Sequence, residues 1–162
     1  AQLVAAYQAT GSSVLAVQEV PMPDTRKYGV VAPKAAATGA ADGHAIQVPH
    51  GQLIEIAGLV EKPQPHVAPS NLAVAGRYVL TPAVFDRIAS QPRGVGGEIQ
   101  LTDGIAGLLA NESVYALRYQ GQRYDCGSKL GFLQATVDLA KQHPEVGADF
   151  TEWMKAQHCA QG

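Results

Sequence analysis

Two short apolar runs on either side of a proline-rich turn constrain the fold of this chain most strongly. The runs are residues 59–60 and 72–80, and the turn between them occupies residues 63–69. Short apolar runs that are bounded by turn residues are typical of buried strands. The sequence therefore predicts two buried strands that are connected through this turn.

An acidic and a basic residue, Glu61 and Lys62, stand where the first run ends, directly before Pro63. Proline biases the residue before it towards extended backbone and cannot donate to a sheet, so we expect an extended Lys62 and the end of the strand there. Strand side chains alternate between faces, and both residues can reach the mouth of one cleft only where the strand ends. The alternative is a solvated ion pair at a strand end.

The rest of the chain alternates between helix and strand signals. Residues 1–10 favour a helix that Gly11 ends, whereas residues 35–43 carry no periodicity and favour a surface loop. We expect four further helices: three that begin at Thr81, Thr102 and Ser128, with these residues as their caps, and a short one at residues 150–155. Strands are predicted at residues 13–20, 28–31 and 114–119, and a hairpin at residues 46–48 and 53–56.

Composition argues against several classes of function. The net charge of −2 and the 16% of charged residues give no reason to expect binding to nucleic acid or to an anionic membrane. We expect no membrane span and no leader, because no apolar run is long enough and no charged-then-apolar segment opens the chain. The two cysteines, Cys126 and Cys159, have neither disulfide-framework nor metal spacing, which predicts a cytoplasmic protein. A start inside a helix, without methionine, suggests part of a longer protein.

Four motifs follow one another in a specific order along most of the chain. They are Arg26-Lys-Tyr-Gly-Val-Val, then Val60-Glu-Lys-Pro with Ser70-Asn-Leu-Ala-Val-Ala-Gly-Arg-Tyr-Val-Leu-Thr-Pro, then Gly96-Gly-Glu-Ile-Gln-Leu-Thr-Asp, and last Tyr124-Asp-Cys-Gly-Ser-Lys-Leu-Gly-Phe-Leu-Gln-Ala. In this order they resemble the sugar-nucleotide pyrophosphorylases, and more narrowly the bacterial UTP–glucose-1-phosphate uridylyltransferases, also called UDP-glucose pyrophosphorylases.

The resemblance implies an α/β fold, with a partial Rossmann-like mixed sheet flanked by helices. Residues 1–162 would be a single sugar-phosphate-binding portion, the C-terminal part of a sugar nucleotidyltransferase fold. The family's glycine-rich phosphate loop and its first metal-binding aspartate match nothing in this sequence. The nucleotide-binding half is therefore expected to be absent from this chain, which by itself should be inactive.

The resemblance also implies a reaction, in which UTP and glucose-1-phosphate give UDP-glucose and pyrophosphate. Lys62 would be the catalytic residue that holds the sugar phosphate, and Glu61 would accept hydrogen bonds from sugar hydroxyls. Gly29 and Val74 would line the sugar pocket, where a Cβ on the glycine would block the sugar ring. Asp125 would bind Mg²⁺ together with a second aspartate from an earlier part of the protein.

From the residues alone, Asp125 lies between a predicted strand and a predicted helix. Such junctions bind ligands in α/β sheets, but a carboxylate there can also simply cap a turn. The leading hypothesis is an incomplete uridylyltransferase, for which the family's dimers and tetramers imply a homo-oligomer. The alternative hypothesis is a non-catalytic assembly or regulatory module that is derived from a sugar nucleotidyltransferase.

Overall fold

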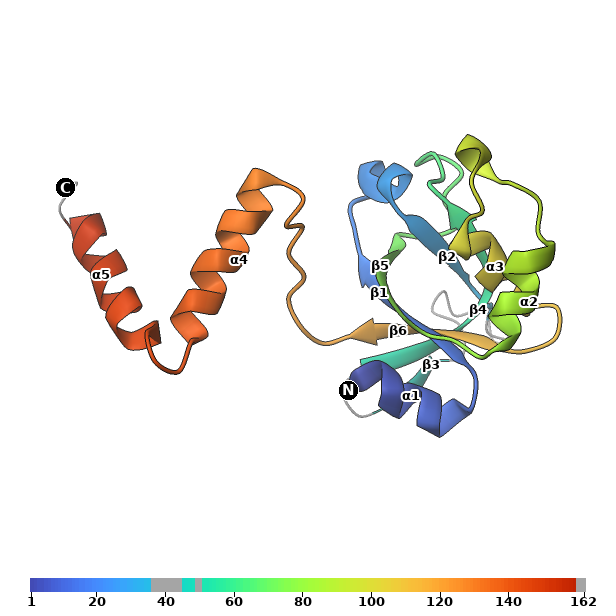
Figure 1. The fold of residues 1–162 in the computed structure, drawn as a ribbon, viewed down its shortest axis with the longest axis horizontal. Coiled ribbons are helices and arrows are strands. Elements are labelled where there is room, and N and C mark those ends of the chain that lie inside the picture. The colour runs from blue at the N-terminus through green and yellow to red at the C-terminus, as the bar shows by residue number, and fades with distance from the viewer. Residues whose placement is uncertain (36–44, 49–50, 160–162) are drawn as a thin grey trace. The chain divides into compact units, whose positions relative to one another are not determined.

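A computed structural model describes residues 1–35, 45–48 and 51–159 of the chain (Figure 1). The chain divides into two compact units, Ala1–Gln120 and Gly121–Gly162, and each is described here by itself. The surface loop that we expect at residues 35–43 lies outside the described residues, except for its first residue.

Strands β1 to β6 and helices α1 to α3 make up the first unit, in an order that agrees with the sequence patterns. The strands predicted at residues 13–20, 28–31, 72–80 and 114–119 are confirmed, and so is the hairpin of β3 and β4. The elements are α1 (Gln2–Thr10), β1 (Ser13–Glu19), a 3-10 turn (Met22–Lys27), β2 (Gly29–Pro33), β3 (Ala45–Val48), β4 (Gly51–Glu61), β5 (Leu72–Val79), α2 (Ala83–Ser90), a second 3-10 turn (Val95–Gly97), α3 (Leu101–Leu108) and β6 (Val114–Tyr119).

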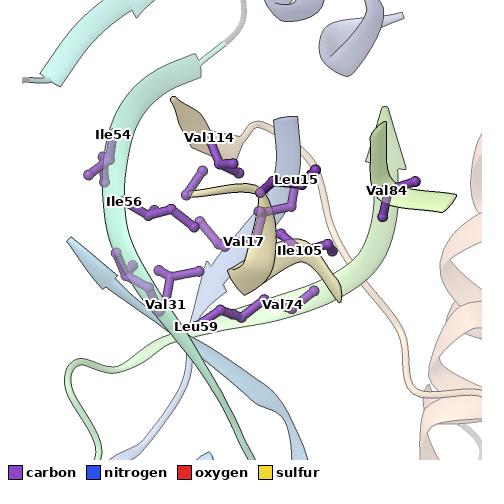
Figure 2. Close-up of a cluster of buried hydrophobic side chains, with 13 residues drawn as sticks. Leu15, Val17, Val31, Ile54, Ile56, Leu59, Val74, Val84, Ile105 and Val114 are labelled. Carbon is purple, nitrogen blue, oxygen red and sulfur yellow. The ribbon is translucent and has the colours of Figure 1, made fainter. Parts of the chain in front are cut away.

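The six strands form one mixed sheet in the order β2-β5-β1-β6-β4-β3. Strand β1 runs parallel to β6 and antiparallel to β5. The long strand β4 pairs with β6 through residues 51–55 and with β2 through residues 56–61. Because β4 pairs with both β6 and β2, the hydrogen-bonded strands form a closed ring. Figure 2 shows β4 curving around a cluster of buried side chains. The predicted mixed sheet flanked by helices is confirmed.

Helices cover both faces of this sheet. Consecutive side chains of a strand point to opposite faces, so Val14 packs with Ala6 of α1, whereas Leu15 packs with Val84 of α2 and Ile105 of α3. Figure 1 accordingly shows α1 apart from α2 and α3. All five of these residues are buried, and each large aliphatic side chain that is removed from water contributes about 1.5–3 kcal/mol.

The expectation that Thr81 caps α2 is wrong. Pro82 occupies the capping position, and no side chain caps this helix. The Thr81 hydroxyl instead donates to Glu112 Oε1 over 2.8 Å, and the fully buried Ser13 hydroxyl donates to the same oxygen over 3.0 Å. A hydrogen bond to a carboxylate is about twice as strong as one to a neutral acceptor. The Thr81 hydroxyl therefore bonds to Glu112, which lies far along the chain, and does not cap its own helix.

The second unit contains helices α4 (Lys129–Gln142) and α5 (Gly147–Cys159). The predicted cap of α4 is confirmed, because Ser128 Oγ accepts a hydrogen bond from the Gly131 N–H over 3.0 Å. The rings of Phe150 and Trp153 lie 5.8 Å apart between centroids. No helix in the described part of the chain is long and apolar enough to cross a membrane.

Candidate functional site

Lys62 adopts left-handed backbone, with φ of 47°, so the expectation of an extended Lys62 before proline is wrong. Two hydrogen bonds and the burial of Pro63 hold this conformation. The Lys62 N–H donates to the Tyr28 carbonyl over 3.0 Å. Pro63 is buried, and its carbonyl accepts from the Thr25 hydroxyl over 3.2 Å. Left-handed backbone costs a residue other than glycine about 1–2 kcal/mol, so tertiary contacts override the local preference here.

This backbone brings the two charged side chains together. Past the end of β4 the strand alternation is broken, and Lys62 Nζ lies 3.6 Å from Glu61 Oε1. The Lys62 side chain is 55% exposed, whereas that of Glu61 is 14% exposed. An accessible cation therefore stands beside a carboxylate that is mostly enclosed. This geometry suits a ligand site and also the solvated ion pair of the alternative interpretation.

Gly29, Glu61 and Val74 come together from three different strands. Gly29 of β2 is the register partner of Glu61 of β4. A Cβ placed on Gly29 would lie 3.3 Å from Glu61 Oε2 and 3.6 Å from Val74 Cγ2 of β5. The structure thus gathers the residues implied for a sugar pocket, although their role in binding stays a prediction.

Thr102 also lies next to Gly29, and the sequence patterns did not identify it as a residue of the candidate site. We expected it to cap α3, but the helix begins at Leu101 with Gln100 in the capping position, so this expectation is wrong. Its Cγ2 methyl would lie only 2.8 Å from a Cβ on Gly29. The chain's own threonine therefore already requires a glycine at position 29. A threonine near a helix start looks like a cap in any sequence, so no local pattern could have revealed this position.

The negative charge of Glu61 contributes to the raised pKa of Tyr78. Tyr78 of β5 is half-buried and packs against the main hydrophobic cluster. Its pKa is raised above the ordinary value of 10.0, first because burial disfavours the phenolate and second because Glu61 is negatively charged. The Glu61 carboxylate therefore lies close enough for Tyr78 to report on it.

Replacing Glu61 by glutamine is expected to bring the pKa of Tyr78 back towards 10.0 without reaching it, since burial remains. The measurement is a spectrophotometric titration of tyrosinate, with a Tyr78→Phe variant to subtract the other tyrosines. Because the folded pKa lies above the unfolded one, this tyrosine's contribution to stability is fully present below pH 10.0 and is lost as pH rises through the folded value. An unchanged Tyr78 titration in the glutamine variant would show that the Glu61 charge does not reach Tyr78.

A hollow of about 390 Å³ lies elsewhere on the first unit. Its charged groups bond to one another: Lys34 Nζ lies 2.8 Å from Glu55 Oε1, and the Ser113 hydroxyl donates to the same oxygen over 3.0 Å. Polar groups that already bond to one another have less hydrogen-bonding capacity left for a ligand than the Glu61 carboxylate has. We therefore place the candidate site at Glu61 and Lys62.

Asp125 belongs to the second unit, in the turn before α4. It is exposed, and its Oδ1 accepts a hydrogen bond from the Gly127 N–H over 3.2 Å. This contact fits the turn-capping alternative, and the metal role stays a prediction. No group of three or more His, Cys, Asp or Glu side chains within the described ranges could hold a metal ion. A single carboxylate is still compatible with Mg²⁺, which often takes its remaining ligands from substrate phosphates and water.

Comparisons with known proteins agree on one family. The family described as nucleotidyl transferase matches residues 1–142. A UTP–glucose-1-phosphate uridylyltransferase of Staphylococcus epidermidis is 44% identical over 154 residues, which are 95% of this chain and 49% of that protein. The corresponding protein of Staphylococcus haemolyticus is 40% identical over the same shares.

Two solved structures show the same likeness. A UTP-bound UDP-glucose pyrophosphorylase from Acinetobacter baumannii has a TM-score of 0.74 and 36% identity, over 94% of this chain and 48% of that one. A UDP-glucose pyrophosphorylase complexed with UDP-glucose has a TM-score of 0.72 and 34% identity, over 88% and 49%. The chain therefore spans about half the length of the curated relatives that it matches.

Proposed function

Because this chain belongs to the nucleotidyl transferase family, we propose that it is the sugar-phosphate-binding part of a UTP–glucose-1-phosphate uridylyltransferase. In the complete reaction, a phosphate oxygen of glucose-1-phosphate bonds to the α-phosphorus of UTP, and the bond from that phosphorus to the leaving pyrophosphate breaks. The products are UDP-glucose and pyrophosphate. The names of the relatives support this reaction, and the remaining half of the site would come from outside these 162 residues.

The observation that carries the proposal is the position of Glu61, whose Oε1 lies 3.6 Å from the Lys62 ammonium and whose Oε2 lies beside Gly29 and Val74. An ionised carboxylate only accepts hydrogen bonds, so Glu61 suits the hydroxyls of a sugar. A lysine ammonium is a compact point charge with three donors, so Lys62 suits a phosphate. A sugar phosphate presents both groups close together, and the site offers a partner for each.

Lys62 contributes positive charge where the reaction accumulates negative charge. Its backbone N–H donates to the Tyr28 carbonyl, which fixes the point from which the exposed side chain reaches towards a phosphate. Groups that are fixed in advance stabilise a transition state better than groups that must first move into position. Glu61 fixes the sugar, and through the sugar it aligns the attacking phosphate.

The proposal includes Mg²⁺, which Asp125 would hold together with ligands from outside this chain. When bound, the ion would neutralise charge on the phosphates. We also propose, from the sequence and the family resemblance, that the protein is cytoplasmic and forms a homo-oligomer.

Binding of glucose-1-phosphate to the purified chain tests the proposal. We expect saturable binding in ligand-observed NMR, weakened by Glu61→Gln about tenfold or more, because a hydrogen bond to a charged group contributes about 1.5–3 kcal/mol. Lys62→Ala should also weaken binding. A matched control is Lys27→Ala, which removes another exposed lysine whose Nζ lies 2.6 Å from Asp24 Oδ1.

Glucose without phosphate should bind more weakly than glucose-1-phosphate, because Lys62 then has no anion to bind. Failure of the wild-type chain to bind glucose-1-phosphate would contradict the proposal and favour the non-catalytic module. Equal binding by Glu61→Gln and wild type would show that this carboxylate does not contact the sugar.

A further inference from the structure

The segment that leads into α4 contains a tyrosine whose hydrogen bond reaches well into that helix. The Tyr124 hydroxyl donates to Asp138 Oδ2 over 2.8 Å, in a partly buried contact between residues 14 positions apart. Asp138 belongs to the second half of α4. A hydrogen bond to a carboxylate is about twice as strong as one to a neutral acceptor. The residue directly before Asp125 is therefore tied to the body of the helix.

The residues after Asp125 are tied to the start of the same helix. The Asp125 carbonyl accepts from the Ser128 N–H over 3.1 Å and from the Ser128 hydroxyl over 3.0 Å. The packing there is tight, because a Cβ on Gly131 would collide with the Asp125 carbonyl oxygen and lie 2.9 Å from Ser128 Oγ. Asp125 is thus held from both sides, although its side chain is exposed.

This arrangement suits a carboxylate that must bind a cation. Asp125 Oδ1 accepts from the Gly127 N–H, which uses one of about four acceptor sites of a carboxylate. Ordering a mobile residue when a ligand binds costs free energy, and a segment that is already fixed avoids this cost. Oxygen ligands of this kind are the ones that Mg²⁺ prefers.

We propose that Tyr124 is a positioning residue, which through its hydrogen bond to Asp138 holds Asp125 in place for Mg²⁺. The inference rests on the proposed function, in which Asp125 is a metal ligand. Groups that orient a metal ligand typically change metal affinity by roughly 10–100-fold. Tyr124 acts on Asp125 through the shared backbone and not through the carboxylate itself, so we expect an effect near the lower end of this range.

Tyr124→Phe tests the inference, because it removes only the hydroxyl. In the 162-residue chain, NMR order parameters of the amides at residues 125–127 should fall from about 0.85, typical of rigid backbone, towards about 0.6. In a protein of the relatives' full length, Mn²⁺ replaces Mg²⁺ as the probe, since both ions suit oxygen ligands. The dissociation constant for Mn²⁺, measured from the EPR signal of the free ion, should rise roughly tenfold.

Two controls separate positioning from a general loss of structure. Binding of glucose-1-phosphate in metal-free buffer should be the same in Tyr124→Phe and wild type, because the inference gives Tyr124 no contact with the sugar. Tyr119→Phe is a matched substitution in β6, where the Tyr119 hydroxyl donates to Gln18 Oε1 over 3.2 Å. It should change neither the affinity for Mn²⁺ nor the order parameters at residues 125–127.

Variants of Asp138 test whether the hydrogen bond itself is responsible. Asp138→Asn keeps an acceptor for the tyrosine hydroxyl and should retain most of the affinity for Mn²⁺. Asp138→Ala should weaken Mn²⁺ binding as much as Tyr124→Phe does, and combining the two should cause little further loss, because both remove the same interaction.

The results distinguish this inference from the proposed function. Unchanged Mn²⁺ affinity in Tyr124→Phe, together with a clear loss in Asp125→Asn, would overturn the inference alone. Unchanged order parameters in Tyr124→Phe, or additive losses in the double variant, would also overturn it. Unchanged Mn²⁺ affinity in Asp125→Asn would overturn the metal role in the proposed function, and this inference with it.

Discussion

Replacing Lys62 by alanine is expected to lower kcat for UDP-glucose formation about 10²–10³-fold in a protein of the relatives' full length. The physical reason is that negative charge on the phosphates increases in the transition state, so this ammonium binds the transition state more strongly than the substrates. The KM for glucose-1-phosphate should change much less than kcat. Steady-state kinetics measure both constants, with Lys27→Ala as the control for loss of an exposed lysine.

A glycine variant separates the charge of Lys62 from its backbone. Because φ at this residue is 47°, Lys62→Gly should be about 1 kcal/mol more stable than Lys62→Ala, since glycine tolerates left-handed backbone. Both variants lack the ammonium, so both should lose activity. If kcat survives in the alanine variant, the pair of Glu61 and Lys62 is only a solvated strand end.

Replacing Gly29 by alanine is expected to lower the free energy of unfolding by about 1–3 kcal/mol, the usual effect of overpacking a core. The new Cβ would lie 2.8 Å from the Cγ2 methyl of Thr102, which is buried on a helix and cannot easily move. Urea denaturation measures the change. Gly58→Ala is a matched control in the same sheet, because a Cβ there would meet only the Ala32 Cβ at 3.6 Å, an ordinary contact.

Thr102→Ser should rescue Gly29→Ala, because serine lacks the methyl with which the new Cβ collides. In a double-mutant cycle, the two substitutions should show a favourable coupling energy of about 0.5–3 kcal/mol. Strictly additive effects would mean that the loss in Gly29→Ala has another cause than contact with Thr102.

Local patterns in the sequence determined where most of the helices and strands lie. The alternating or continuous apolar character of β1 and β6 predicts these strands nearly to the residue. The Ser128 cap of α4 is confirmed because its partner, the Gly131 N–H, lies only three residues away. Such signals depend on neighbours along the chain, so they are readable before the chain folds.

The tertiary structure alone decided the three features for which local rules fail. Lys62 precedes a proline yet is left-handed, because Tyr28 and Pro63 hold its backbone. The Thr81 hydroxyl bonds to Glu112 instead of capping its helix. Thr102 was expected to be another cap, and its side chain lies over Gly29.

In the candidate site too, the sequence identifies single residues, and only the tertiary structure brings them together. The sequence motifs identify Gly29, Glu61 and Val74 one by one, but the three are far apart along the chain. They meet because β2 pairs with both β4 and β5, so that all three strands contribute to one end of a curved sheet. Local preferences select each strand, whereas the burial of side chains between strands and helices selects which strands become neighbours. That second choice places Glu61 beside Gly29 and brings Thr102, from a separate helix, into contact with the same point.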